Sequence, residues 1–206
     1  ERHPRLITVD ISGYGEDAAY AGMKAYDLLV QAESGLASVT GHPAGPGRVG
    51  VSVCDIACGM NAHAAVLEAL IERGMTGRGK GVAVSLFDGM ADWMNVPLIY
   101  FEGTGRAPER VGLAHPSICP YGAFPTADGA LVLISIQNER EWADLCRTVL
   151  GDAALATDPR CLNNAARVAN RAALVPRLEH LLRERGGATW LAALKAAQVP
   201  CGPIND

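Results

Sequence analysis

The chain has 206 residues, of which 49% are hydrophobic and 19% are charged, and its formal net charge is -4. This apolar content excludes a disordered chain. The 22 acidic residues against 18 basic ones exclude a protein that binds nucleic acid by neutralising phosphates. No run of about 18 uninterrupted apolar residues is present, so we expect no membrane span.

The first half of the chain alternates strand-like and helix-like patterns. In chain order we predict a strand at 6–11, a helix at 23–36, a Gly/Pro-rich loop at 40–47, a strand at 49–53, a helix from Asp55, a strand at 82–86 and a helix at 87–101. This βαβαβα order predicts an α/β, Rossmann-like layer with parallel strands.

The helix predicted from Asp55 has the clearest periodicity. Its apolar positions form one stripe along a single helix face: Ile56, Met60, Ala64, Leu67 and Ile71. Asp55 stands where an N-cap is expected, and Gly74 and Gly77 end the pattern.

The second half of the chain has a different organisation. A Gly-, Pro- and Arg-rich break at 103–120 precedes a predicted hairpin, whose strands flank the Asp128-Gly129 turn. Helical patterns follow at 139–150, 164–185 and 189–197. We therefore predict an α/β domain at 1–105, a linker at 106–119 and a small α+β domain at 120–206. The family resemblance described below further implies that 1–105 is part of a large domain and that 106–119 contains an active-site loop.

Two glycine-rich segments imitate nucleotide-binding motifs. Residues 45–50 match the dinucleotide fingerprint, but a loop precedes them and a strand is predicted after them, which reverses the required order. Residues 74–81 imitate a P-loop but carry Gly81 in place of the Ser or Thr that binds magnesium. The nearby Arg73, Arg78 and Lys80 are interpreted as solvated charges, with contact to a ligand phosphate as the minority alternative.

The six cysteines are scattered through apolar patterns, which favours reduced core thiols in a cytosolic protein. Cys54 and Cys58 lie four residues apart, but no second ligand pair completes a tetrahedral zinc site. We predict no metal.

Several segments together resemble the class III (CaiB/BaiF) CoA-transferases, and they follow one another along the chain in the same order as in that family. The central ones are Val53–Met60 (VCDIACGM) and Ala69–Gly79 (ALIERGMTGRG). The others are Pro4–Ile7, Ser12–Gly15, Ala25–Asp27 with Gln31, Pro120–Gly122, Asn138 with Glu141-Trp142, and Val199–Pro203.

The resemblance implies a larger protein, a homodimer and a pair of substrates. Members of the family are about twice this long and interlock as homodimers, so this chain corresponds to their middle portion. The implied substrates are an acyl-CoA and a carboxylic acid, with coenzyme A as a substrate and no separate cofactor. The resemblance also implies a cytoplasmic enzyme without nucleic-acid or membrane partners.

The resemblance assigns the nucleophile to Asp55. In the family the matching carboxylate attacks the acyl-CoA thioester, forms a mixed anhydride, and is then converted to an aspartyl-CoA thioester. From spacing alone, Asp55 is an N-cap; the two roles do not exclude each other, because a cap bond would orient the carboxylate.

Further site residues are also implied by the resemblance. Lys24 and Ala25 would lie along CoA, and Tyr26 would line the CoA and acyl site. Related 2-methylacyl-CoA racemases have a catalytic His where this chain has Tyr26, and Tyr, with a pKa near 10, is badly matched to that proton transfer. Gly112, Leu113, Ala114 and His115 stand where the transferases carry a mobile glycine-rich loop.

The leading hypothesis is therefore a transferase that moves CoA between short-chain acids. His115 and Ser117 could hydrogen-bond the carboxylate of a small dicarboxylate, or serve an ordinary role in loop structure. The alternatives are a racemase-like isomerase and a non-catalytic fragment that requires a missing N-terminal half.

Overall fold

The computed structural model describes residues 2–16, 19–20 and 22–205. The chain divides into two compact units, Glu1–Gly112 and Leu113–Asp206. The boundary between the units falls within the predicted linker. Each unit is described by itself below.

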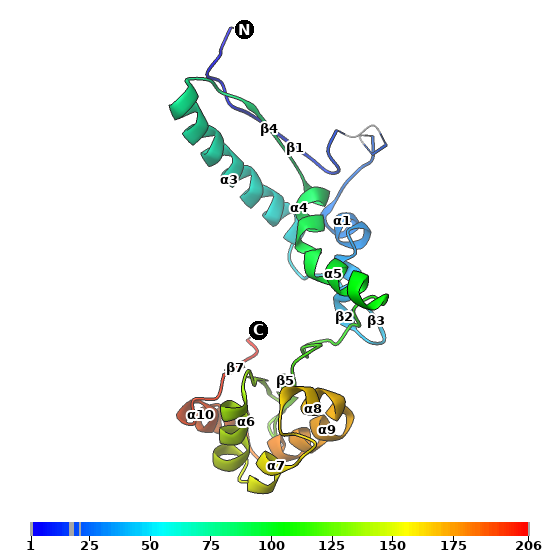
Figure 1. Ribbon diagram of the computed structural model, residues 1–206, viewed down its shortest axis with the longest axis vertical. Coiled ribbons are helices and arrows are strands. Elements are labelled where there is room, and N and C mark those ends of the chain that lie inside the picture. Colours follow the sequence, from blue (N-terminus) through cyan, green and yellow to red (C-terminus); the bar gives the residue numbers. More distant parts are fainter. Residues whose placement is uncertain (1, 17–18, 21, 206) are drawn as a thin grey trace. The chain divides into compact units, whose positions relative to one another are not determined.

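The first unit contains a parallel strand pair. Strand β1 (Thr8–Ser12) pairs with β4 (Gly81–Ser85), in the register from Thr8 opposite Gly81 to Ser12 opposite Ser85. Helix α3 (Val53–Thr76) leads into β4 and runs alongside the pair (Figure 1). The prediction of a mixed α/β fold with parallel strands is confirmed, although the described sheet holds two strands.

Short elements gather at the end of the first unit where α3 begins (Figure 1). They are α1 (Asp27–Glu33), α2 (Leu36–Val39), β2 (Gly41–His42), β3 (Gly45–Pro46), α4 (Leu86–Trp93) and α5 (Asn95–Thr104). A small core of Val30, Cys54, Ala57 and Met90 joins α1, α3 and α4. This core fixes the first turn of α3 against its neighbours.

The strand predicted at 49–53 is wrong. Val53 is the first residue of α3, and Ser52 is its N-cap. The β-branched run is short, and the apolar contacts of Val53 and Cys54 with the core described above favour the helix. The segment 40–47, predicted as a loop, contains the antiparallel pair β2–β3.

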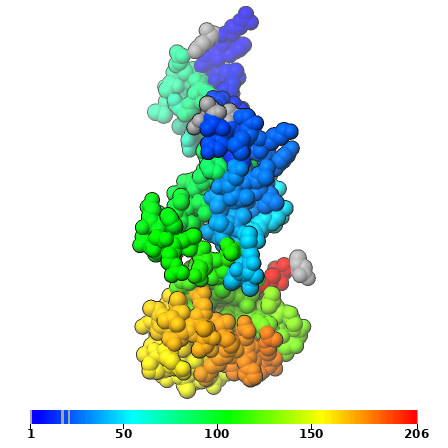
Figure 2. Space-filling model, turned by 90° about the vertical axis from the view of Figure 1, so that its right-hand side faces the viewer, coloured from blue at the N-terminus to red at the C-terminus, as the bar shows by residue number. Residues whose placement is uncertain are grey.

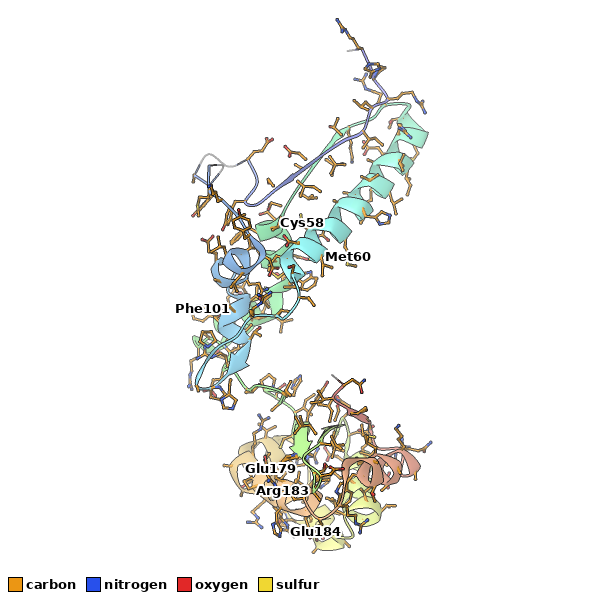
Figure 3. All side chains as sticks on the ribbon, turned by 180° about the vertical axis from the view of Figure 1, so that it is seen from behind. Cys58, Met60, Phe101, Glu179, Arg183 and Glu184 are labelled. Atoms are coloured by element: carbon orange, nitrogen blue, oxygen red, sulfur yellow. The ribbon has the colours of Figure 1, made fainter. Side chains whose placement is uncertain are left out.

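Helix α3 buries a different face from the apolar stripe that its sequence shows. Its buried side carries the small residues Cys54, Ala57, Cys58, Ala62 and Ala69. Small side chains let a helix approach its neighbours closely, whereas the large aliphatic side chains lie on the opposite face and are exposed. Figure 3 labels one residue of each kind, the buried Cys58 and Met60, which is 66% exposed.

Among the described residues, α3 is long and apolar enough to cross a membrane by length and composition alone. Only 28% of its most apolar window is buried. A single helix of this kind is weak support for a membrane span, because helices covered by other protein surfaces pass the same test.

Two glycines permit close backbone approach in the first unit. A Cβ on Gly79 would lie 1.9 Å from the carbonyl oxygen of Leu6, where the chain enters the β1–β4 pair. A Cβ on Gly13 would lie 2.2 Å from that of Ala25, so only glycine lets the segment before α1 lie against the end of β1.

The second unit is an antiparallel sheet packed against helices. Strands β5 (Tyr121–Pro125), β6 (Leu131–Ser135) and β7 (Cys201–Pro203) lie in that order, and the predicted hairpin is β5–β6. The helical elements are α6 (Glu139–Asp144), a π-helical turn (Leu145–Val149), α7 (Ala153–Thr157), α8 (Asn164–Ala169), α9 (Arg171–Leu182) and α10 (Gly187–Ala196). In Figure 2, α7 to α9 form the face toward the viewer, coloured yellow to orange.

The core of the second unit follows the strand alternation. Phe124, Val132 and Ile134 point from the sheet into a cluster that includes Trp142 and Trp190. The buried Trp190 indole donates a hydrogen bond to the Leu182 carbonyl at 2.7 Å. Sequence patterns predicted neither α7 nor β7, because both are short and depend on tertiary contacts.

Asp128 in the β5–β6 turn also holds the start of α10. Its carboxylate accepts from Thr126 Oγ1 at 2.6 Å and from the Gly187 N–H at 3.1 and 3.2 Å. These bonds lower the pKa of Asp128, with the Thr126 hydroxyl contributing most. They require the ionised carboxylate.

We expect Asp128→Asn to flatten the acid dependence of stability in this unit. A lowered folded-state pKa stabilises the fold above the unfolded pKa of about 4, and this contribution is lost as the pH falls through the folded pKa. Urea-dependent hydrogen exchange of α10 at pH 7 and pH 3 measures the effect. The exposed Glu184→Gln is the control; an identical pH dependence in wild type and Asp128→Asn would contradict the assignment.

Candidate active site

Asp55 lies in the first turn of α3, three residues after the N-cap Ser52. It is exposed, and no hydrogen bond or ion pair engages its carboxylate in the part of the chain that the structure describes. The expectation that Asp55 is itself the N-cap is therefore wrong, because the helix begins two residues earlier. The position near a helix N-terminus still favours its negative charge.

The capping role at α3 is filled by a residue from another helix. Ser52 makes no side-chain cap bond. Instead, the buried carboxylate of Asp27 in α1 accepts the Cys54 N–H through Oδ1 at 2.8 Å. Its Oδ2 accepts from Gln31 Nε2 at 2.8 Å, and Gln31 Oε1 accepts the Val49 N–H at 2.8 Å. These three bonds tie α1, the approach to α3 and the first turn of α3 together.

The segment Lys24–Tyr26 enters α1 directly before Asp27. Lys24 is exposed, Ala25 packs against Gly13 and the small core, and Tyr26 is the N-cap residue of α1 with 70% of its surface exposed. Tyr26 precedes Asp27, and Asp55 follows Cys54. Since Asp27 and Cys54 are hydrogen-bonded, the structure brings the backbone at Tyr26 and the backbone at Asp55 together.

The predicted active-site loop divides between the two units. Gly112 has a φ of 63° and donates to the Gly41 carbonyl at 2.8 Å in the first unit. Leu113 and Ala114 are exposed residues of the second unit. His115 is half-buried there; its ring stacks on Tyr121 with centroids 5.1 Å apart, and its carbonyl accepts from Arg171.

The His115 ring has a defined hydrogen-bonding partner. The Ser117 N–H donates to its Nδ1 at 3.2 Å. An Nδ1 that accepts places the proton of neutral imidazole on Nε2. His115 can therefore present an Nε2–H donor to a carboxylate.

The two thiols beside Asp55 are poor competitors for a nucleophilic role. Burial, followed by the Asp27 carboxylate, raises the pKa of Cys54 to about 12. Burial, followed by the charge of Asp55, raises the pKa of Cys58. Both thiols stay protonated at neutral pH, so the exposed carboxylate is the available nucleophile in this turn. All six cysteines are unpaired, as predicted.

The basic cluster after α3 is occupied by protein contacts. Lys80 pairs with Glu72, and Arg73 donates to the Arg5 carbonyl at 3.2 Å. Lys80 and Arg73 are therefore engaged by groups of the protein, whereas the sequence predicted solvated charges. The described residues hold no group of three or more metal-ligating side chains.

Sequence reasoning missed Asp27 and Gln31 as contributors to the site. The two residues lie four apart, the spacing that places side chains together on one helix face. That spacing, in a segment that resembles the family, was the signal available from the sequence.

Comparisons with known proteins establish the family of this chain. The chain matches the sequence profile of CoA-transferase family III over residues 1–206. It belongs to this family.

Individual relatives extend the comparison. The chain is 39% identical to acetyl-CoA:oxalate CoA-transferase of Acetobacter aceti, over 99% of this chain and 52% of that protein. It is 36% identical to succinate–glutarate CoA-transferase of Agrobacterium fabrum, over 99% of this chain and 51% of that protein. A crystal structure of a CaiB/BaiF family protein from Brucella suis superposes with a TM-score of 0.84 at 37% identity, covering 98% of this chain and 53% of that one. The chain thus spans about half the length of these relatives.

Proposed function

We propose that the protein containing this chain is a CoA-transferase that uses Asp55 as its nucleophile. The observation that carries this proposal is an exposed, unengaged carboxylate in the first turn of α3, in a chain that belongs to CoA-transferase family III. The helix N-terminus stabilises the carboxylate as an anion, and fixed geometry makes this weak nucleophile effective.

The proposed reaction proceeds through two covalent states of Asp55. The carboxylate attacks the thioester carbonyl of the donor acyl-CoA and expels CoA thiolate, which leaves a mixed anhydride. The thiolate then attacks the aspartyl carbonyl, releases the donor acid and leaves an aspartyl-CoA thioester. The acceptor carboxylate runs the same steps in reverse, so that acyl-CoA of the acceptor is released and Asp55 is regenerated.

We propose short dicarboxylates as the substrate class. The relatives named above are named for oxalate, succinate and glutarate. The Nε2–H of His115 offers one donor for a carboxylate. Tyr26 and Lys24 are exposed at the entrance to α1, where they are available for contact with CoA.

We further propose that the working enzyme is a homodimer. The large aliphatic side chains of α3 are exposed over much of the helix: Ile56, Met60, Leu67, Ile71 and Met75. An apolar face of this extent needs protein cover, and a second copy is the occupant that the family resemblance implies.

Trapping of the covalent intermediate tests the proposed function. The intact protein, incubated with succinyl-CoA and then hydroxylamine, should acquire a hydroxamate on Asp55, located by peptide mass spectrometry. Omission of succinyl-CoA is the control and should give no adduct. Adduct formation on another residue, or transfer of CoA without any adduct on Asp55, would show that the assignment is wrong.

A further inference from the structure

We infer that Asp27, held by Gln31, is the positioning residue that sets the orientation of the nucleophile-bearing turn. This inference rests on the proposed role of Asp55. Asp27 is 8% exposed and Gln31 is fully buried, so neither side chain is available to bind substrate. Their bonds lead to the backbone at Cys54, the residue before Asp55.

The donor and the acceptor of each hydrogen bond in this cluster can be assigned. The Val49 N–H can only donate, so the atom of Gln31 facing it must be the oxygen. Gln31 therefore presents its amide NH₂ to Asp27, which must accept. The Cys54 N–H can only donate, so the second Asp27 oxygen must accept as well. A residue at position 27 must thus accept on both sides, which the carboxylate does and an amide does not.

The same cluster links the nucleophile to Tyr26. The Tyr26 carbonyl accepts the Val30 N–H at 3.1 Å in the first turn of α1, while the next side chain, Asp27, turns inward to α3. The buried Val30, Cys54, Ala57 and Met90 enclose this contact. A shift of the Asp27 carboxylate would therefore move the backbone at Asp55 relative to Tyr26.

A double-mutant cycle on the intact protein tests this role. Asp27→Asn places an NH₂ group against the Gln31 NH₂. Rotation of the amide at position 27 would instead set its NH₂ against the Cys54 N–H, and rotation of the Gln31 amide would set its NH₂ against the Val49 N–H. Two donors therefore face each other in every arrangement. Gln31→Glu instead opposes two carboxylates. In the double variant Asp27→Asn/Gln31→Glu, the amide NH₂ introduced at position 27 donates to the carboxylate introduced at position 31. The bonds to the Cys54 and Val49 N–H groups are thereby restored. The weak 3.5 Å contact from Gln31 Nε2 to the Val49 carbonyl is lost in this variant.

We expect each single variant to lower kcat about 100-fold with KM for succinyl-CoA changed by less than about threefold, because misplacement of a nucleophile by about 1 Å costs this much. The double variant should recover to within about tenfold of wild type. Rates are normalised to the folded fraction from thermal melts, so a role confined to stability would leave kcat unchanged.

The outcomes separate this inference from the proposed function. If wild type forms the Asp55 hydroxamate and folded Asp27→Asn keeps wild-type kcat, the positioning role is wrong and the nucleophile stands. If wild type transfers CoA without an adduct on Asp55, the assignment of Asp55 as the nucleophile fails, and this inference loses its basis. If Asp27→Asn does not fold, the double variant decides: recovery of kcat supports the inference, and a folded but inactive double variant overturns it.

Discussion

Asp55→Asn is expected to reduce CoA transfer by about 10⁴-fold or more in the intact protein, since loss of a covalent nucleophile removes the reaction path itself. An amide keeps the size and position of the side chain but cannot attack a thioester. Because no described hydrogen bond engages the Asp55 carboxylate, the substitution should leave folding unchanged. Transfer from succinyl-CoA to glutarate, followed by liquid chromatography, measures the effect.

Glu68→Gln is the matched control for this substitution. Glu68 is another exposed acid on α3, and its change removes the same charge from the same helix. We expect its kcat to stay within about twofold of wild type. Equal losses in the two variants would indicate a general electrostatic effect of α3, and full activity in Asp55→Asn would exclude the covalent mechanism.

Arg167→Met is expected to destabilise the second unit by about 3 kcal/mol. Arg167 is fully buried in α8, where it donates to the carbonyls of Cys119 at 2.7 Å and Cys161 at 3.1 Å and pairs with Glu139. Its guanidinium carbon lies 5.1 Å from the centroid of the Trp142 ring. Methionine fills similar space but leaves both carbonyls without these donors, and that desolvation cost dominates.

Arg160→Met is the control for the Arg167 substitution. Arg160 also pairs with an acid, Asp158, but its side chain is 66% exposed. Exposed ion pairs contribute little to stability because solvent screens them, so we expect only a small loss. Urea-dependent hydrogen exchange of peptides from β6 and α9 resolves the second unit in the intact protein. A loss for Arg167→Met no larger than that for Arg160→Met would contradict the assigned role.

Local sequence patterns were sufficient for the strands β1, β4, β5 and β6 and for the approximate positions of the longer helices α3, α9 and α10. These strands have β-branched or alternating apolar residues and are bounded by glycine or proline turns, so local signals suffice. The ordered segments around Asp55 were likewise sufficient to place the chain among the CoA-transferases, a placement that the family match confirms. The roles given to Asp55, Lys24–Tyr26 and Gly112–His115 remain predictions.

Tertiary structure decided the start and the orientation of α3. The periodicity of Ile56, Met60 and Leu67 correctly indicates a helix, but it cannot say whether the large or the small side chains meet the neighbouring elements. The small face packs inside the unit because Cys54, Ala57 and Cys58 allow close approach to α1 and α4.

The residue that caps α3 also could not be predicted from local sequence patterns. Sequence alone assigns caps to nearby residues and therefore selected Asp55, whereas the cap comes from Asp27, 27 positions before Cys54 in the chain. A hydrogen bond over that separation exists only after α1 and α3 have packed. The sequence by itself determined the family and led to the prediction that Asp55 is the nucleophile. Only the packing decided that none of the described residues bonds the Asp55 carboxylate, and that another acid, Asp27, holds the start of its helix.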